Sequence, residues 1–472
     1  MSIEVNPNLD VDRLRRNVRG QVFTPGDAGY DDAQRLFVPV YDSVHPAVIA
    51  QVSDAEDVAA VLTTARETGL ELAIRSGGHS AAGHSTAEGG IVIDLRGLKS
   101  LEIDLESRTA WANSGLTAAE YSEATNAKGL ATGLGDTGSV GLGGITLGGG
   151  IGFLVRKHGM TIDSLLAAEL VTADGEVVYT DSESHSDLFW AIRGGGGNFG
   201  IATRFKLRLQ PLDKIVGGMM ILPATADTIV GFIAEAEQAP DELSTIANVM
   251  TCPPMPFVPE EIHGSLVIMA LVAWCGDLDE GQKVMGRFRT LARPIADMVQ
   301  EMPYPEIYGP EDEEYRPLAV ARTMWADSFE PATAETILGF LEDSDAPMRV
   351  AQLRVLGGAV ARVPNDATAF AHRDRKMMIN VASFYEGPDD RARREAWVSD
   401  FAKALSNGDT SGYVGFLADE GQERVRAAYP GATWDRLRRV KAQYDPDNVF
   451  RLNQNIPPAT VNPEVESGAE GI

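Results

Sequence analysis

A glycine-rich run in the first third of the chain places the strongest constraint on the fold. Half of the twenty residues 133–152, GLGDTGSVGLGGITLGGGIG, are glycine. Each glycine inside a helix or strand costs roughly 0.5–1 kcal/mol relative to alanine, so we expect no helix to start in this run. Backbone without side chains can instead lie flat against a large planar ligand and donate N–H groups to it. The run therefore predicts a ligand-binding loop.

The first part of the run, Gly133 to Gly138, matches the GxGxxG fingerprint of dinucleotide-binding domains. That fingerprint requires a preceding strand, a helix that opens within it and an acidic residue about 20 positions later. More glycine follows here, so we do not assign the fingerprint. The sequence also lacks GxxxxGK[ST], HExxH and GxSxG, which mark phosphate loops, zinc peptidases and serine hydrolases.

Length and charge narrow the class of protein further. The chain has 472 residues, which favours two domains, and its net charge is −27 at pH 7. Such an acidic surface repels nucleic-acid phosphates and anionic lipids, so we expect neither as a partner. The sequence contains no apolar run typical of a membrane span or a secretory signal. We expect a cytoplasmic protein that is a monomer or a homodimer.

Cysteine and histidine placement gives little support to metal or disulfide chemistry. The two cysteines, Cys252 and Cys275, form no CxxC motif, and two thiols are the more common state of such a pair. Seven histidines are present, with no close pair at helical spacing outside the loop that holds His79 and His84. We expect no metal site.

Hydrophobic patterning divides the chain into two regions. In the first region short strands alternate with short helices, and two helix starts have capping-box spacing, Ser53 with Glu56 and Thr117 with Glu120. In the second region longer apolar strands alternate with helices, which predicts a sheet with helices on one face. The Pro- and Glu-rich run 301–317 within it predicts an insertion or a mobile loop.

The stretch RSGGHS, residues 75–80, places a histidine on a glycine hinge directly after an apolar strand. The serine and glycines after Arg75 offer N–H donors without side chains in the way, which suits the charged part of a ligand. Arg75 itself either adds positive charge to that site or is a surface residue beyond the strand end. An isolated histidine at such a turn usually has no role, but His79 lies among three glycine clusters, 75–80, 133–152 and 194–200, which favours a role in binding.

Five motifs occur in a fixed order: RSGGHS, GGIVIDL, VGLGGITLGGGIGFLVRKHG, DLFWAIRGGGGNFG and YDPDNVFRLNQNI. Together they closely resemble the berberine-bridge-enzyme-like flavoproteins of the vanillyl-alcohol oxidase superfamily. The resemblance covers residues of about 40–212 and 410–458. It is weak between these ranges, in the region that determines substrate specificity in the family. It implies an α+β fold with a two-part FAD-binding domain of the PCMH type. It also implies a substrate domain whose antiparallel sheet is covered by helices.

The resemblance and the change of pattern together suggest the domain boundaries. We expect an N-terminal segment at 1–39, the FAD-binding domain at 40–212, the substrate domain at 213–410, a C-terminal return to the FAD domain at 411–460 and a disordered tail at 461–472.

The resemblance implies FAD joined covalently to His79 through a ring methyl group of the isoalloxazine. In this family such a tether raises the flavin potential and favours hydride abstraction. The glycine-rich run would line the isoalloxazine and the ribityl chain, and Ile201 and Asn455 would fall near the flavin by position. The residues expected to bind the cofactor are His79, Arg75, Ser76, Gly77, Gly78, Ser80, His84, Thr137, Gly138, Val140, Gly143, Gly144, Gly148, Gly149, Ile201, Asn453 and Asn455.

Three positions depart from the family pattern. Many relatives carry a second tether, a cysteine, where this chain has Thr137, which cannot form a thioether, so we expect a single covalent link. Ile151 replaces a tyrosine of plant relatives, and Phe416 replaces the C-terminal tyrosine that serves as a base toward alcohols; a phenylalanine cannot take a proton. Val140, in contrast, lies where relatives with valine admit dioxygen, which favours an oxidase.

These departures favour a substrate that loses hydride without a strong base. We expect an FAD-dependent oxidase that transfers a hydride from an amine, an alcohol or a phenolic or polyketide-like metabolite to flavin N5 and reduces O2 to H2O2. Asn380 would orient the substrate and Tyr413 is the nearest remaining phenol, so these are the expected catalytic residues. For these two residues the alternatives are that Asn380 is an ordinary polar residue of a strand and that Tyr413 is a tyrosine of the core, and for Tyr413 the sequence favours this alternative. The alternatives are a dehydrogenase with another acceptor, an oxygenating flavoprotein and a non-catalytic flavin or ligand carrier.

Overall fold

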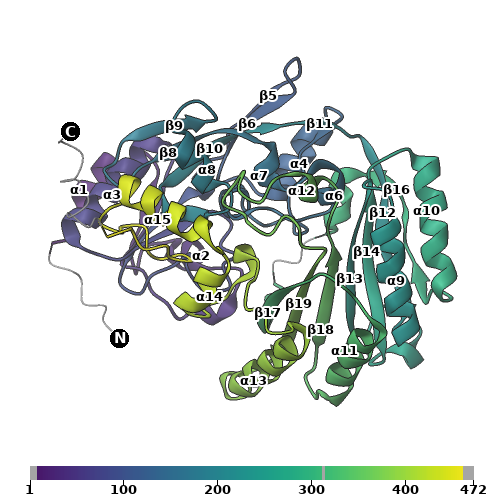
Figure 1. Cartoon of the computed structure of the whole chain (residues 1–472). Helices are drawn as coiled ribbons and strands as arrows, with labels where there is room; N and C mark the ends of the chain where they lie inside the picture. Colours follow the sequence, from purple (N-terminus) through teal and green to yellow (C-terminus); the bar gives the residue numbers. More distant parts are fainter. Residues whose placement is uncertain (1–7, 311–313, 461–472) are drawn as a thin grey trace, which may run out of the picture.

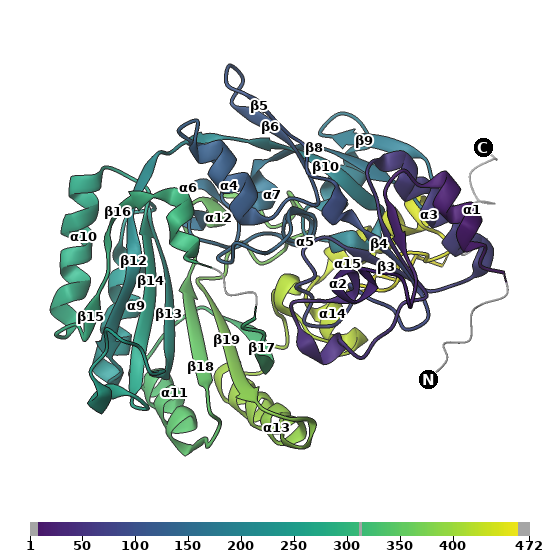
Figure 2. The same ribbon diagram turned by 180° about the vertical axis from the view of Figure 1, so that it is seen from behind.

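Two bodies lie side by side in the computed structural model, which describes residues 8–310 and 314–460 (Figure 1). One body contains the first and last described helices, α1 (Val11–Asn17) and α15 (Ala432–Tyr444), and we call it the cofactor-side body because it holds the residues expected to bind FAD. The other body contains the largest sheet (Figure 2). The tail expected to be disordered, 461–472, lies outside the described residues, as do the first seven residues. Among the described helices, none has the length and apolar character needed to cross a membrane.

A small sheet leads into the glycine loop that contains His79. Its order is β1 (Gln21–Phe23), β2 (Val48–Gln51), β4 (Ile91–Asp94) and β3 (Leu72–Arg75), with β1 antiparallel to β2 and the other pairs parallel. Helix α3 (Ala55–Thr68) joins β2 to β3 and buries Val58, Val61 and Leu62 in the core beneath this sheet. Because β3 ends at Arg75, the glycine loop begins at the carboxyl end of a buried strand.

Helix caps confirm one expected capping box and correct the other. In α4 (Ala118–Asn126) the nitrogen of Glu120 donates to Thr117 Oγ1 at 3.2 Å, and the nitrogen of Thr117 donates to Glu120 Oε2 at 2.7 Å. The box expected at Ser53 is wrong by one residue, because Asp54 caps α3 by accepting from the nitrogen of Asp57 at 2.9 Å. The Asp57 carboxylate then accepts from the nitrogen of Ser53 at 2.9 Å. A carboxylate accepts several N–H groups at once, which a serine hydroxyl does less well.

A second sheet of the same body is antiparallel. Its order is β5 (Leu101–Asp104), β6 (Thr109–Asn113), β10 (Ile201–Arg208), β8 (Leu165–Val171) and β9 (Val177–Asp181). Strands β8 and β9 are joined by a turn at Asp174-Gly175, where Gly175 has a φ of +88° that glycine adopts most readily. The helix α8 (Ser186–Ile192) and the cluster GGGGNFG lie between β9 and β10 in the chain.

The largest sheet forms the second body. Its order is β15 (Ala296–Asp297), β12 (Lys214–Pro223), β14 (Leu266–Trp274), β13 (Leu243–Thr251), β18 (Arg349–Val355), β19 (Met377–Tyr385) and β17 (Leu318–Ala326), and β16 (Gln300–Pro303) pairs with β12. Four helices cover one face of it (Figure 1): α9 (Ala226–Gln238), α10 (Leu278–Leu291), α11 (Pro331–Asp343) and α13 (Pro388–Leu405). The expected antiparallel sheet covered by helices is confirmed. Its opposite face packs partly against the first body.

The expectation that no helix starts in the glycine run is wrong, because α5 spans Leu142–Gly148. Two distant carbonyls hold its first turn: the nitrogen of Leu142 donates to Leu116 O at 2.8 Å, and the nitrogen of Gly143 donates to Ser114 O at 3.1 Å. A Cβ on Gly143 would lie 2.9 Å from the Cβ of Ser76. Close packing against neighbouring backbone therefore overrides the poor helix propensity of glycine.

The run 301–317 is only in part the loop that its composition predicts. Its first residues form the end of β16, and Tyr304–Tyr308 form a 3₁₀ helix, η5, whose Tyr304 is fully buried. The hydroxyl groups of Tyr304 and Tyr308 lie 3.2 Å apart. The buried Tyr304 and the half-buried Tyr308 thus fix the first half of the run against the cofactor-side body, while 311–313 lie outside the described residues.

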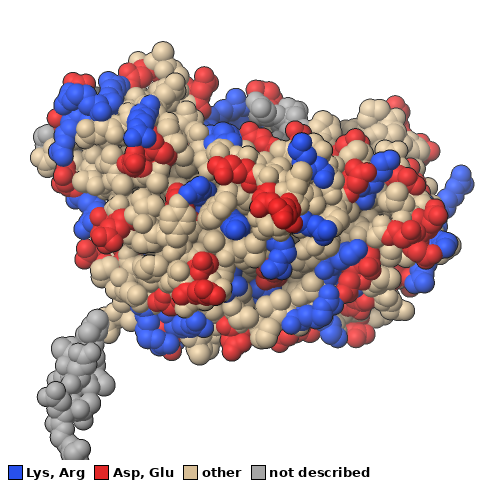
Figure 3. Space-filling view, turned by 90° about the horizontal axis from the view of Figure 1, so that it is seen from above, with Lys and Arg blue, Asp and Glu red and all other residues tan. Residues whose placement is uncertain are grey.

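Shorter elements connect these parts. They are α2 (Tyr30–Gln34), η1 (Pro39–Tyr41), η2 (Leu95–Gly97), β7 (Leu130–Ala131), α6 (Val155–His158), α7 (Thr161–Ser164), η3 (Gly196–Asn198), β11 (Gln210–Pro211), η4 (Glu260–Ile262), α12 (Ala359–Arg362), η6 (Val414–Phe416) and α14 (Gln422–Ala427). Acidic and basic side chains are interspersed over the face seen from above (Figure 3). Exposed ion pairs such as Arg13 with Glu67, at 3.1 Å, contribute only about 0–1 kcal/mol each.

A buried lysine fastens the C-terminal return to the cofactor-side body. Helix α15 ends at Tyr444, as the Asp-Pro step predicts. Lys441 Nζ has no exposed surface and donates to Asn198 O at 2.8 Å, to Asp445 Oδ2 at 2.6 Å and to Phe450 O at 2.9 Å. Asp445 also accepts from the nitrogens of Val449 and Phe450. All three protons of the ammonium group are therefore satisfied inside the protein.

Replacing Lys441 with methionine should lower the free energy of unfolding by about 3–5 kcal/mol, because the Asp445 carboxylate would remain buried without its partner. A urea titration followed by circular dichroism measures the change. The control is Glu67→Gln at the exposed Arg13 pair, for which we expect a change of at most about 1 kcal/mol. Equal effects of the two substitutions would contradict the role assigned to Lys441.

Candidate functional site

Two glycine-rich segments meet where the small sheet ends. A Cβ on Gly77 would overlap the backbone nitrogen of Gly141, so neither position has room for a side chain. Ser76 Oγ donates to Ser114 O at 2.6 Å and accepts from the nitrogen of Gly143 at 3.2 Å. The RSGGHS loop and the start of α5 are therefore one packed unit, although they are about 65 residues apart in the chain.

His79 is half-buried in this unit. Burial lowers the pKa of its imidazole to about 4, and a hydrogen bond to the backbone of Ser139 acts in the opposite direction. A backbone group that favours the protonated ring must be the carbonyl, accepting the ring N–H. At neutral pH the ring is thus uncharged, with one nitrogen bound to Ser139 and the other carrying a lone pair.

Neighbours of His79 in the loop have structural partners. The backbone nitrogen of His84 donates to Ser80 Oγ at 3.3 Å. Burial lowers the pKa of the His84 imidazole, and the nearby Asp419 carboxylate opposes that shift. Gly78 has a φ of +74°, which favours glycine, and a Cβ there would lie 3.2 Å from Leu36 Cδ2.

Of the two alternatives for Arg75, a surface residue beyond the strand end is wrong. Its side chain is completely buried, and burial lowers the pKa of the guanidinium to about 10. It donates to the carbonyls of Ser85, at 3.1 Å, and of Ala33. Its Nη2 has no hydrogen-bond partner within the described residues. Most of its donors hold neighbouring backbone, so a direct contact with a cofactor remains an expectation.

Helix α5 offers one open glycine face. Gly144 is exposed, and a Cβ placed there meets no atom of the described residues within 4 Å. Gly148 and Gly149 are buried, and a Cβ on Gly149 would lie 3.0 Å from the Tyr413 ring. Gly144 is therefore the α5 glycine at which a flat ligand could approach bare backbone. Among the expected cofactor residues just before α5, Thr137 and Val140 are half-buried, and Gly138 is buried with its carbonyl bound to Ala119.

The C-terminal return brings two asparagines toward the glycine cluster GGGGNFG. Asn453 Nδ2 donates to Phe450 O at 2.9 Å, but the Oδ1 atoms of Asn453 and Asn455 are buried without a partner among the described residues. Asn198, which sequence reasoning did not assign, donates to Gln454 O at 3.1 Å and accepts from the nitrogen of Ile456 at 2.9 Å. The motif GGGGNFG was its only sequence signal.

The side chain of Ile201 lies in the hydrophobic core rather than at an open surface. It is 1% exposed and packs in the same cluster as Phe450 and Val171. Only its backbone can reach a ligand, so the expected proximity to the flavin concerns the start of β10 and not the isoleucine side chain.

On the large sheet, three amide side chains face one another across neighbouring strands. Asn248, Gln352 and Asn380 are directly opposite in the registers of β13, β18 and β19, and we call them the amide row. Gln352 Nε2 donates to Asn248 Oδ1 at 2.9 Å, and Asn248 Nδ2 donates to Met269 O at 3.1 Å. Asn380 is half-buried, and its Oδ1 finds no hydrogen-bond partner in the described part of the chain.

Arg354 connects the amide row to the cofactor-side body. It lies two residues from Gln352 on β18, on the same sheet face, and its Nε donates to Gln352 Oε1 at 2.9 Å. Its Nη1 donates to Ile151 O at 3.3 Å, and its Nη2 is bound to the Asp136 carboxylate. The guanidinium also lies over the Phe416 ring, 5.1 Å from the centroid. The amide row therefore faces the glycine-rich segments.

Tyr413 is buried behind the glycine run. Its hydroxyl oxygen accepts from the nitrogen of Gly150 at 2.8 Å, and burial raises the pKa of the phenol to about 12. A phenol with that pKa stays protonated at neutral pH and is a poor base. The geometry favours a positioning role for Tyr413 over the expected catalytic one.

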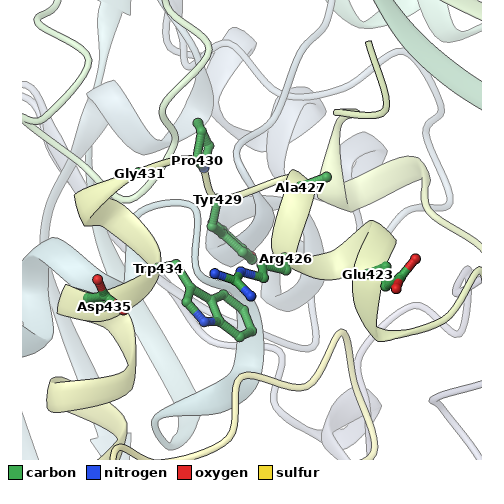
Figure 4. Close-up of a pocket in the computed structure, with 8 residues that line it drawn as sticks. All are labelled: Glu423, Arg426, Ala427, Tyr429, Pro430, Gly431, Trp434 and Asp435. Carbon is green, nitrogen blue, oxygen red and sulfur yellow. The ribbon is translucent and has the colours of Figure 1, made fainter. Parts of the chain in front are cut away.

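A separate pocket of about 330 Å³ lies where α14 meets α15, lined by Glu423, Arg426, Ala427, Tyr429, Pro430, Gly431, Trp434 and Asp435 (Figure 4). None of the residues expected to bind the cofactor lines it. The described residues also hold no cluster of three or more His, Cys, Asp or Glu side chains placed to bind a metal ion. Both cysteines are buried free thiols.

Comparison with known proteins identifies the ligand class. Residues 46–181 match a family model described as an FAD binding domain, and residues 412–457 match one described as berberine and berberine like. The chain is 30% identical over 461 residues to (R)-6-hydroxynicotine oxidase of Paenarthrobacter nicotinovorans, covering 94% of this chain and 97% of that protein. It is 27% identical over 479 residues to reticuline oxidase of Eschscholzia californica, covering 88% and 83%.

Solved structures show the same architecture. The crystal structure of 6-hydroxy-D-nicotine oxidase from Arthrobacter nicotinovorans has a TM-score of 0.82 and 27% identity, covering 94% of this chain and 98% of that one. A variant of berberine bridge enzyme has a TM-score of 0.84 and 23% identity, covering 95% and 100%. The chain therefore belongs to the berberine bridge enzyme-like family of FAD-linked oxidoreductases in the vanillyl-alcohol oxidase superfamily, and it is an oxidoreductase.

The site residues fit FAD. Gly144 offers bare backbone to a flat ring system, and the neutral His79 imidazole belongs to the same packed unit of the RSGGHS loop and α5. The unpartnered Oδ1 atoms of Asn453 and Asn455 are acceptors that a bound ligand can satisfy. Burial of such atoms without a partner costs free energy, which a hydrogen-bonding cofactor would recover.

Replacing Gly144 with alanine should reduce FAD loading while leaving the fold intact. The new methyl group enters open space in the apoprotein, and alanine adds up to about 1 kcal/mol of helix stability. The flavin-to-protein ratio measures loading, and a urea titration of apoprotein measures stability. The matched control is Gly339→Ala in α11, where a Cβ also meets nothing within 4 Å of the described residues. Normal FAD loading in Gly144→Ala would remove Gly144 from the cofactor site.

Proposed function

We propose that the protein is an FAD-dependent oxidase that takes a hydride from a neutral amine, or from a phenolic or polyketide-like metabolite, and passes the electrons to O2. Bound FAD supplies the hydride acceptor at N5 and, once reduced, the electrons that convert O2 to H2O2. The observation that carries the proposal is the amide row, which presents uncharged groups to the cofactor-side body. The relative named as (R)-6-hydroxynicotine oxidase supports the amine class.

Among the described residues linked to the amide row, none offers a free strong base. The Arg354 guanidinium forms an ion pair with the Asp136 carboxylate. The pair has no net charge, and the carboxylate is not free to act as a base. Phe416 cannot take a proton, and Tyr413 stays protonated. A substrate that needs its hydroxyl proton removed would find no acceptor among these described groups. An amine carries its own lone pair and can release a hydride without that step.

Asn380 is proposed to orient the substrate. It is the member of the amide row whose side chain makes no hydrogen bond to the described residues, whereas Gln352 donates to Asn248 and accepts from Arg354. An amide can donate and accept but is too weak a base to take a proton. Its role is therefore to hold an N–H or O–H group of the substrate in a fixed direction.

The proposal also includes one covalent link, from His79 to FAD, and a site open to dioxygen at Val140. The neutral state of the His79 ring supports the link, since a lone pair is needed to form it. Thr137 has no thiol group, so it cannot form a second covalent link as a cysteine would. Val140 is half-buried and lies next to the start of α5.

An anaerobic screen tests the proposed reaction. Amines should bleach the yellow flavin faster than primary alcohols of similar size, and air should then restore the colour with release of H2O2. Asn380→Ala should lower kcat/KM roughly tenfold, equivalent to about 1.4 kcal/mol from one lost hydrogen bond. Gln300→Ala, an exposed amide on the edge strand β16, is the control and should have no effect. Slow reoxidation in air would instead identify a dehydrogenase.

Tyr413→Phe should lower the rate at most moderately and leave the shape of the pH profile between pH 6 and 10 unchanged. The phenol pKa is raised to about 12 by burial, so the group does not ionise in that range and cannot supply a limb of the profile. Steady-state rates at saturating O2 provide the measurement. Loss of an alkaline or acidic limb in the variant would show that Tyr413 is the base after all.

A further inference from the structure

An exposed aromatic ring stacks on the proposed FAD-linking histidine. The rings of Phe37 and His79 have centroids 4.1 Å apart and planes inclined by 18°. Phe37 is 41% exposed, although large aromatic side chains usually bury most of their surface. Its packing in the apolar cores of the protein is therefore not what fixes its position. The stacking contact with the His79 imidazole is the ring contact that Phe37 makes among the described residues.

Buried charges anchor the segment that carries Phe37. We call residues 33–42 the strap. The carbonyl of Ala33, at its start, accepts from Arg75 and from Arg96 Nη2, the latter at 2.9 Å. The Asp94 carboxylate pairs with both cations: its Oδ2 lies 2.6 Å from Arg96 Nη2 and 3.8 Å from Arg75 Nη1. Because Arg75 and Asp94 have no exposed surface, this end of the strap is rigidly held.

The other end of the strap is tied to the same loop and to the second body. Tyr41 donates its hydroxyl to Ala81 O at 2.8 Å, two residues beyond His79. Arg316 Nη2 binds Asp42 Oδ1 at 2.5 Å and belongs to the segment that leads into β17. Between these anchors, Leu36 packs against Gly78. The strap therefore crosses the RSGGHS loop and lays Phe37 on the imidazole.

Stacking and the Ser139 carbonyl restrain the ring in complementary ways. A flat partner at 4.1 Å restricts rotation of the imidazole about its side-chain bonds, and the carbonyl at its edge selects which nitrogen carries the proton. The other nitrogen keeps its lone pair and a fixed direction. A nucleophile held in this way loses less entropy when it reacts.

We propose that Phe37 is a positioning residue for covalent attachment of FAD, holding the His79 imidazole in the orientation from which it forms its bond to the cofactor. The inference rests on the proposed function in one respect, the tether at His79. In the overall change, a C–N bond to the ring methyl carbon replaces one methyl C–H bond. One further hydrogen leaves from the imidazole N–H, and dioxygen takes up both hydrogens and the two electrons as H2O2.

Attachment kinetics test the proposal directly. Apoprotein from riboflavin-starved cells is mixed with FAD in air, and samples are precipitated with acid to separate released from covalent flavin. Phe37→Ala should slow attachment roughly three- to tenfold, the range expected for one aromatic stacking contact. Phe37→Tyr keeps the ring and should restore the parent rate. Phe257→Ala removes another exposed phenylalanine, 46% exposed, and should have no effect.

Two further measurements separate positioning from folding and from the tether itself. Equal non-covalent FAD binding by the Phe37 variants, measured from fluorescence quenching before attachment, excludes misfolding as the cause. Attachment by Phe37→Ala at the parent rate would overturn the role of Phe37 alone. Covalent flavin in His79→Ala, located by mass spectrometry of the tryptic peptides, would overturn the tether and the inference together.

Discussion

The cofactor-side body depends on the three hydrogen bonds made by the fully buried ammonium group of Lys441. Burial lowers the pKa of this lysine, and the Asp445 carboxylate opposes the shift. A charge in this position is tolerable only because every donor is used, two of them on backbone carbonyls of Asn198 and Phe450. One side chain thereby joins the glycine cluster to the C-terminal return and presents Asn453 and Asn455 beside it.

A second buried cation performs the corresponding task between the two bodies. Arg354 stands on the substrate sheet, yet two of its partners, Asp136 and the carbonyl of Ile151, belong to the glycine run. The same guanidinium fixes the amide of Gln352, so that cofactor loop and substrate wall share one hydrogen-bond network. Displacement of either body would leave a buried charge unpaired, which strongly opposes relative motion.

The sequence predicted elements whose causes are local. The Thr117–Glu120 capping box and the end of α15 both follow from neighbouring residues, and the ordered motifs indicated the family and FAD. Sequence-based prediction failed where a structure depends on residues that are far apart in the chain. Helix α5 needs carbonyls of another segment, and Arg354 meets an acid 218 positions away in the chain. The aromatic neighbour of His79 was missed because Phe37 carries no motif. Single-chain patterns cannot show such pairings, since packing decides them.

The docking of α15 has a consequence for biosynthesis. Segments far apart in the sequence flank the glycine loops: the strap contacts His79, and Asn455 follows Lys441 in the C-terminal return. Translation proceeds from the N-terminus, so the glycine loops exist long before the segment that closes over them is made. The full set of these contacts can therefore form only after the segment that holds Asn455 has been synthesised.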